Sequence, residues 1–115
     1  NGVLLDWIAR VAADCQWVTS VCTGALLLTA AGPAKGRRVT THWAFVESLR
    51  ARGEAAEVLA DVRWVRDGNI VTAAGVSAGI DMALWLLGEW RGPAFARRVQ
   101  RAMEYHPAPP YAAHV

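Results

Sequence analysis

Hydrophobic positions follow two spacings along the chain, one typical of helices and one typical of strands. In residues 3–13, Leu4, Ile8 and Val11 share one helical face, whereas Asp6 and Arg10 fall elsewhere. The segment 76–90 is apolar almost all round, which predicts a buried helix. The full pattern predicts helices at 3–13, 23–31, 43–52, 76–90 and 93–105, strands at 16–21 and 37–42, and a hairpin around Asp67-Gly68-Asn69.

The alternation of strands with helices predicts an α/β fold, a layered sandwich with a mainly parallel central sheet. Three or four strands make a thin sheet, because a parallel sheet needs both faces covered and more neighbouring strands. The chain also begins at Asn1 rather than at a methionine. We therefore expect an N-terminally incomplete fold, in which residues 1–115 are the C-terminal portion of a single domain.

Composition excludes several classes of protein. The chain has 115 residues, of which 54% are hydrophobic and 19% charged, and this balance is typical of a globular domain. No apolar run reaches the roughly 18 residues that a membrane-spanning helix needs. A net charge of +2 is too small to indicate nucleic-acid binding. The arginines at 91, 97, 98 and 101 are interpreted as a solvated helix face.

The chain has two cysteines, Cys15 and Cys22. If the residues between them form a strand, the two lie about 20 Å apart at ~3.3 Å per residue, too far for a local disulfide. Two unpaired cysteines fit a reducing, cytoplasmic compartment. Cys15 falls in a predicted helix-to-strand loop, and we expect it to be structural.

Cys22 is the candidate nucleophile. It falls where the strand at 16–21 ends and the helix at 23–31 begins, with the small residues Ser20 and Gly24 two positions away on either side. Such a tight turn is the arrangement of a nucleophile elbow, with cysteine in place of serine. The free N–H groups of the helix N-terminus favour a thiolate and can hold an anion that forms during attack. The alternative interpretation is a small, buried apolar residue.

The remaining candidates carry weaker signals. His42 ends the predicted strand at 37–42 and is interpreted either as a structural histidine or as a residue near the site. His106 and His114 lie in the C-terminal tail, and no histidine has a metal-ligand spacing with the cysteines, so we expect no metal site. Gly75 lies in a glycine-rich stretch after the hairpin, which favours close helix packing near the pocket.

The quoted segments resemble the ThiJ/PfpI superfamily. VTSVCTGALLLTAAGPAKGRRVTTHWA is similar to its nucleophile segment, and RDGNIVTAAGVSAGIDMALWL to the hairpin and helix that follow. VQRAMEYHPAPPY resembles the C-terminal end of the isocyanide hydratases within that superfamily. The resemblance implies a flavodoxin-like fold, related to the class I glutamine amidotransferases. It also implies that an N-terminal part of the domain, which carries the catalytic acid, is absent from this chain.

The resemblance also implies roles for individual residues. Cys22 matches the family nucleophile, and Thr23 matches the following residue, whose N–H serves the oxyanion site. His42 matches a histidine close to the cysteine in many members. Together with Gly24 of the tight turn and Gly75 of the glycine-rich stretch, it is expected to line the substrate pocket. The protease-like members have a histidine directly after the cysteine, and Thr23 in its place argues against peptidase activity.

The function that this resemblance implies is hydration of an isocyanide to an N-substituted formamide through a covalent thioimidate on Cys22. It requires no metal or organic cofactor. The implied partners are a small-molecule substrate and a second copy of the chain in a homodimer, with no membrane and no nucleic acid bound by this segment.

Two other functions are compatible with the same segment. One is the ligand-sensing domain of an AraC-type transcription regulator, since such regulators often carry a similar Cys-Thr-Gly segment. A helix-turn-helix domain further along the chain would distinguish it. The other is a serine-hydrolase-like fold with cysteine in the elbow. That fold needs an aspartate and a histidine downstream, and the part of the chain that follows Cys22 is too short for it.

Overall fold

The computed structural model describes residues 1–111. It divides into two compact units, Asn1–Met82 and the residues from Ala83 onward, and each is described by itself. The elements in chain order are α1 (Gly2–Ala12), β1 (Val18–Ser20), α2 (Gly24–Ala31), β2 (Arg38–Val39), the 3-10 helix η1 (Trp43–Phe45), α3 (Val46–Arg52), β3 (Glu57–Val58), β4 (Trp64–Asp67), β5 (Ile70–Ala73), α4 (Val76–Arg91) and α5 (Pro93–Ala102). His114 lies outside the described residues.

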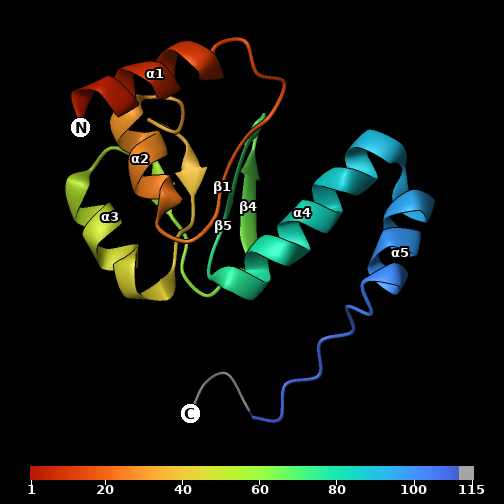
Figure 1. Ribbon diagram of the computed structural model, residues 1–115. Coiled ribbons are helices and arrows are strands. Elements are labelled where there is room, and N and C mark those ends of the chain that lie inside the picture. The colour runs from red at the N-terminus through yellow and green to blue at the C-terminus, as the bar shows by residue number, and fades with distance from the viewer. Residues whose placement is uncertain (112–115) are drawn as a thin grey trace. The chain divides into compact units, whose positions relative to one another are not determined.

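A three-stranded sheet in the first unit has the strand order β1-β5-β4 (Figure 1). Strand β1 pairs in parallel with β5, with Ser20 opposite Thr72. Strands β4 and β5 form the predicted antiparallel hairpin, with Asp67 opposite Ile70. The turn between them contains Gly68 at φ +63°, a conformation that glycine adopts at low cost.

A second sheet consists of β2 and β3, which pair in parallel with Val39 opposite Val58. Buried threonines connect it to the first sheet. The Thr40 N–H donates to Thr72 Oγ1 at 2.8 Å, and Thr40 Oγ1 donates to the Leu59 carbonyl at 2.8 Å. The bond to Thr72 gives the residues after β2 a fixed position beside β5, near its carboxyl end, whereas the bond to Leu59 joins Thr40 to the end of β3.

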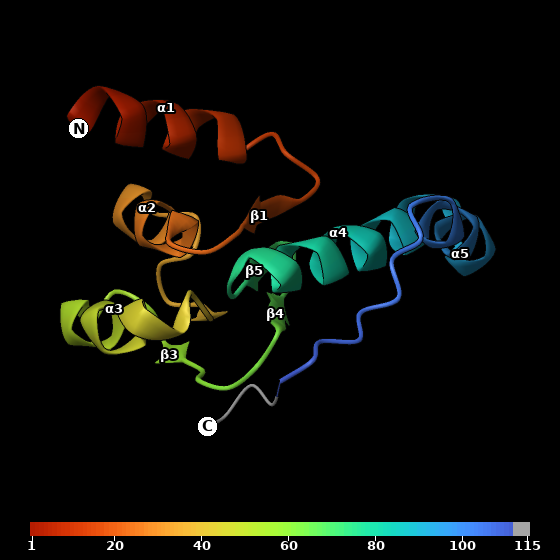
Figure 2. The ribbon, with the colours of Figure 1, turned by 60° about the horizontal axis from the view of Figure 1, so that its bottom comes forward.

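The main hydrophobic core lies between the helices and both sheets of the first unit. Its buried members are Ala25, Leu28, Ala34, Val39, Val46, Leu49, Val58 and Ile70, and Ile8 of α1 packs against them. Figure 2 shows α2 and α3 as separate helices beside the strands. The core therefore holds β1 and α2 together, and the turn between them carries Cys22.

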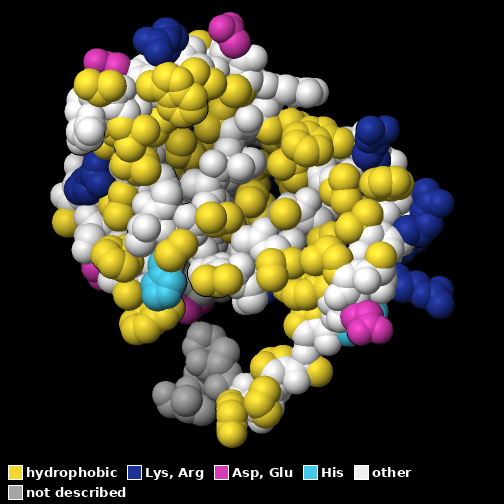
Figure 3. Space-filling model, viewed as in Figure 1, with side chains coloured by type: hydrophobic (Ala, Val, Ile, Leu, Met, Phe, Trp, Pro, Cys, Tyr) yellow, Lys and Arg dark blue, Asp and Glu magenta, His cyan; other side chains and the backbone are white. Residues whose placement is uncertain are grey.

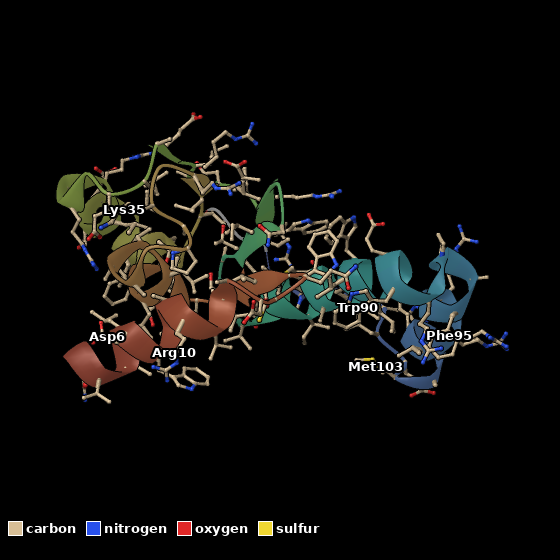
Figure 4. All side chains as sticks on the ribbon, turned by 90° about the horizontal axis from the view of Figure 1, so that it is seen from above. Asp6, Arg10, Lys35, Trp90, Phe95 and Met103 are labelled. Carbon is tan, nitrogen blue, oxygen red and sulfur yellow. The ribbon has the colours of Figure 1, made fainter. Side chains whose placement is uncertain are left out.

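Helix α1 is less buried than its pattern predicts. It has no buried residue, and Val3, Trp7 and Leu4 are exposed. Figure 3 shows hydrophobic side chains gathered over this helix, and in Figure 4 Asp6 and Arg10 project from it. Ile8 alone of the predicted face packs against the main core.

The second unit contains the remainder of α4 and helix α5. A Cβ placed on Gly88 would lie 3.8 Å from Ala96 Cβ, so small residues allow the two helices to pack closely. Trp90, Phe95 and Met103 are exposed on this unit (Figure 4). The four arginines at 91, 97, 98 and 101 are also exposed, as expected of a solvated face.

Several predicted boundaries were wrong. The strand predicted at 37–42 is only Arg38–Val39, because the side chain of Thr72, rather than a neighbouring strand, accepts the next N–H. Strand β3 was not predicted. The last helix ends at Ala102 rather than at residue 105. Helix α4 is buried along one stripe, at Ala78, Gly79, Met82 and Leu86, whereas Val76 and Trp90 are exposed.

Asp67 connects the hairpin to the start of β2 and makes stability depend on pH. The Arg38 N–H donates to Asp67 Oδ2 at 2.8 Å, and Arg37 lies 3.5 Å from Oδ1. The Arg38 N–H first, and then the charge of Arg37, lower the pKa of Asp67 below its usual 3.8. A lowered folded-state pKa means that the carboxylate stabilises the fold above pH 3.8, and that this stabilisation is lost as pH falls through the lower folded value.

We therefore expect Asp67→Asn to lower the free energy of unfolding at neutral pH, and expect the difference from wild type to shrink below pH 3.8. Denaturant unfolding at several pH values measures it. Asp6→Asn, which changes an exposed carboxylate on α1, is the matched control. A difference that stays constant with pH would contradict the assignment.

Candidate active site

Cys22 lies on the turn between β1 and α2, as the sequence predicts. Its φ is +53°, a left-handed conformation that is uncommon outside glycine and costs about 1–3 kcal/mol. Such a conformation persists only where the surroundings hold it. Two hydrogen bonds do so here. The Cys22 N–H donates to the Ala74 carbonyl at 2.8 Å, and Thr41 Oγ1 donates to the Cys22 carbonyl at 2.7 Å.

The first turn of α2 has free N–H groups next to the cysteine. Thr23 is the N-cap residue, and its side chain makes no capping hydrogen bond. Among residues 1–111, no hydrogen bond from the Thr23 N–H is found, whereas the Gly24 N–H donates to the Val21 carbonyl at 3.0 Å. An N–H group in this position at a helix N-terminus can stabilise an anion.

The small residues on either side of Cys22 are needed for steric reasons. A Cβ placed on Gly24 would lie 3.3 Å from Ser20 Cβ, closer than side chains normally approach. Ser20 itself is buried, and its Oγ has no hydrogen-bond partner among the described residues. The chain can therefore pass from β1 into α2 within a few residues only because both positions are small.

His42 and Gly75, two of the residues predicted to line the pocket, lie close to each other. A Cβ placed on Gly75 would lie 3.5 Å from His42 Cδ2. His42 does not end a strand as predicted. It caps η1, where its Nδ1 accepts from the Ala44 N–H at 3.1 Å. With Nδ1 used as an acceptor, the ring proton of a neutral His42 is on Nε2.

Two hydrogen bonds to the backbone of Cys22 bring these predicted residues toward the same turn. Ala74, which accepts from the Cys22 N–H, precedes Gly75, and Thr41, which donates to the Cys22 carbonyl, precedes His42. Thr41 was not predicted. The only signal for it in the sequence was its place before His42 in the Thr-Thr-His segment.

The other sequence candidates lie elsewhere. Cys15 is exposed in the loop after α1, and its Sγ donates to the Val11 carbonyl at 3.3 Å. Both cysteines are free thiols. His106 follows α5 in the second unit. Within the part of the chain that the structure describes, no three His, Cys, Asp or Glu side chains are grouped as a metal site would need. Over the same residues, no helix is both long and apolar enough to cross a membrane.

Exposed apolar side chains border the turn. Val21, which precedes the cysteine, is 51% exposed, and Val76, which follows Gly75, is 82% exposed. A Cβ placed on Gly79 would lie 2.9 Å from Val21 Cγ1, so α4 begins close to the turn. Val21 and Val76 therefore give the turn an exposed apolar border.

A cysteine on a strained strand-to-helix turn, in an α/β layered fold, defines a class of proteins with a nucleophile elbow. The family model of the DJ-1/PfpI family matches residues 1–89, and the chain belongs to that family. This confirms the predicted resemblance and the predicted fold.

Individual relatives match over most of this chain. It is 49% identical to the isonitrile hydratase of Pseudomonas putida over 107 residues, which cover 93% of this chain and 46% of that protein. The crystal structure of a ThiJ/PfpI family protein from Pseudomonas syringae superimposes with a TM-score of 0.89 at 37% identity, over 100% of this chain and 46% of that one. The chain thus spans about half the length of these relatives.

A transcription regulator matches as well. The chain is 37% identical to the HTH-type transcriptional regulator GlxA of Rhizobium meliloti over 84 residues, which cover 71% of this chain and 25% of the regulator. The proteins that this chain resembles therefore include both an enzyme and a regulator.

Proposed function

We propose that the protein carrying this chain is a cysteine-dependent hydratase that converts an isocyanide to an N-substituted formamide, with Cys22 as nucleophile. The observation that carries the proposal is the 49% identity to an isonitrile hydratase, which extends across the Cys22 turn. The strained turn and the unbonded Thr23 N–H support it, because both suit attack by a thiolate and stabilisation of the charge that develops.

In the proposed reaction the Cys22 thiolate attacks the terminal carbon of the isocyanide and forms a C–S bond. A proton is transferred to that carbon, which gives a thioimidate. Water then adds to the C=N bond, and the C–S bond breaks to release the formamide and the thiol. Water is the only co-reactant, so the scheme needs no oxidant, reductant, metal or organic cofactor.

Three further predicted site residues, Thr23, Gly24 and Gly75, have roles in this scheme. The Thr23 N–H faces the charge that forms during attack and hydration. Gly24 keeps the turn tight, and Gly75 leaves space beside His42. The acid that supplies the proton is, by family resemblance, in an N-terminal part of the domain that this chain does not contain. On the same grounds we propose that residues 1–115 are the C-terminal portion of a single DJ-1/PfpI domain.

The apolar border of the turn supports a substrate with an apolar substituent on nitrogen. An isocyanide carries no charge, and an apolar pocket with a few polar groups would bind it. We further propose that the protein is a homodimer, as the family resemblance implies, and that it is cytoplasmic, which its two free cysteines favour. We also propose that this segment binds neither a membrane nor nucleic acid.

The second candidate function is ligand sensing in a transcription regulator, which the similarity to GlxA favours. In that case the pocket would bind a small molecule without turnover, and the complete reading frame would encode a helix-turn-helix domain. The presence of that domain, together with ligand binding but no product, would favour the regulator over the enzyme.

The experiment that tests the hydratase uses protein expressed from its complete natural reading frame. An aryl isocyanide is added, and the N-aryl formamide is followed by chromatography against a no-enzyme control. We expect formamide to form with turnover, because the thiol is regenerated in each cycle. Folded protein that yields no formamide would exclude this activity on aryl isocyanides and favour the ligand-sensing function.

A further inference from the structure

We propose that Thr41 is a positioning residue, which aims the Thr23 N–H at the reacting atoms by holding the carbonyl of Cys22. The proposal rests on the proposed function, in which that N–H stabilises developing charge. Thr41 is 1% exposed, and its Oγ1 donates to the Cys22 carbonyl at 2.7 Å. The side chain is therefore removed from solvent and committed to this one backbone oxygen.

The geometry of one peptide group connects the Thr41 hydrogen bond to the direction of the Thr23 N–H. The Cys22 carbonyl and the Thr23 N–H belong to the same planar peptide unit, and no cis peptide occurs in the described chain. In a trans peptide the C=O and N–H bonds point in opposite directions. By fixing the carbonyl on the Thr41 side, the hydroxyl thus fixes the N–H on the opposite side, where no hydrogen bond to residues 1–111 uses it.

The second hydrogen bond to Cys22 limits the effect of Thr41 to the peptide group between Cys22 and Thr23. The Ala74 carbonyl accepts from the Cys22 N–H, which fixes the peptide group before the cysteine. The peptide group after it can still rotate about ψ of Cys22 within the turn that the Gly24–Val21 bond closes, and the Thr41 hydroxyl is the side-chain contact that holds its carbonyl. Loss of the Thr41 hydroxyl would therefore allow the Thr23 N–H to turn away from the reacting atoms, while β1 stays paired with β5.

The neighbouring threonine provides a matched control. Thr40 is also 1% exposed, and its hydroxyl also donates to a backbone carbonyl at 2.8 Å, but that carbonyl belongs to Leu59. Thr40→Val and Thr41→Val therefore remove the same group from adjacent buried positions. Only the second removes a contact to the elbow, and Thr41→Ser keeps the hydroxyl while removing a methyl group.

The test compares these variants in protein expressed from the complete reading frame. For Thr41→Val we expect kcat for formamide formation to fall by about tenfold to a hundredfold with KM nearly unchanged, because the misplaced N–H acts on charge present in the transition state. We expect Thr41→Ser to restore most of kcat. Thr40→Val is expected to lower the melting temperature by a similar amount but to leave kcat near the wild-type value.

A second readout keeps the proposal testable if the wild-type protein makes no formamide. In a Cys15→Ser background, the rate constant for alkylation of Cys22 by iodoacetamide should fall in Thr41→Val and not in Thr40→Val, because only the first loosens the turn that holds the thiolate at the helix N-terminus. Equal effects of both valine variants in either assay, in proportion to their loss of stability, would overturn the proposal. Unchanged kcat in a folded Thr41→Val enzyme would also overturn it, while leaving the hydratase function intact.

Discussion

Replacing Cys22 with serine is expected to reduce formamide formation by at least about 10³-fold, to a rate near that of the uncatalysed reaction. The hydroxyl of serine fits the same turn but is a far weaker nucleophile at neutral pH than a thiol. The strained φ of +53° is a property of the backbone, so serine should keep the fold and the Thr23 N–H in place. The measurement is the aryl isocyanide assay with circular dichroism as a check on folding.

Cys15 is the control for this prediction. It is exposed in the loop after α1, and Cys15→Ser should keep full activity. A Cys22→Ser protein that is folded and still forms formamide at the wild-type rate would exclude covalent catalysis by Cys22. Loss of activity in both variants together with loss of the fold would point to a structural role for the thiols.

The position of Cys22 on a strand-to-helix turn could be predicted because it depends on short-range chemistry. A β-rich run, a cysteine between small residues and a helical run are adjacent in sequence, and their order alone places Cys22 on a turn. The hairpin was predictable for the same reason, since Asp67-Gly68-Asn69 is a local turn signal between two apolar runs.

The contacts that hold the turn were not predictable, because they join residues distant in the sequence. Thr41 and Ala74 reach the backbone of Cys22 across many intervening residues, and nothing in the local pattern marks either as a partner. Strand β3 was missed because it is only two residues long and its pairing with β2 is parallel, so no turn joins the two strands. His42 was placed at a strand end because Thr40 and Thr41 are β-branched, but both use their side chains in tertiary hydrogen bonds.

The candidate site therefore depends on both local and long-range features of the sequence. The place of the candidate nucleophile follows from one local turn, whereas the orientation of its backbone follows from two long-range hydrogen bonds. A variant can therefore retain Cys22 at the correct place in the chain and still lose activity, if the turn is altered sterically.

Gly24→Val is the sharpest such variant. A Cβ at this position would already lie 3.3 Å from Ser20 Cβ, and valine adds two methyl groups beyond it. We expect a loss of about 1–3 kcal/mol in the free energy of unfolding, as for other overpacked sites. We also expect kcat/KM to fall by about a hundredfold, because a shift of the turn by about 1 Å misplaces the thiolate and the Thr23 N–H. Denaturant unfolding and the formamide assay measure the two effects.

Substitutions at Ser20 test whether this steric contact is the cause. Ser20→Gly removes the Cβ that Gly24→Val would meet, whereas Ser20→Ala keeps it and removes only the unpartnered hydroxyl. The activity lost in Gly24→Val should therefore be partly restored in the Ser20→Gly background and not in the Ser20→Ala background. Equal behaviour in both backgrounds would mean that valine acts elsewhere, and that the small residues around Cys22 do not keep the elbow tight through mutual contact.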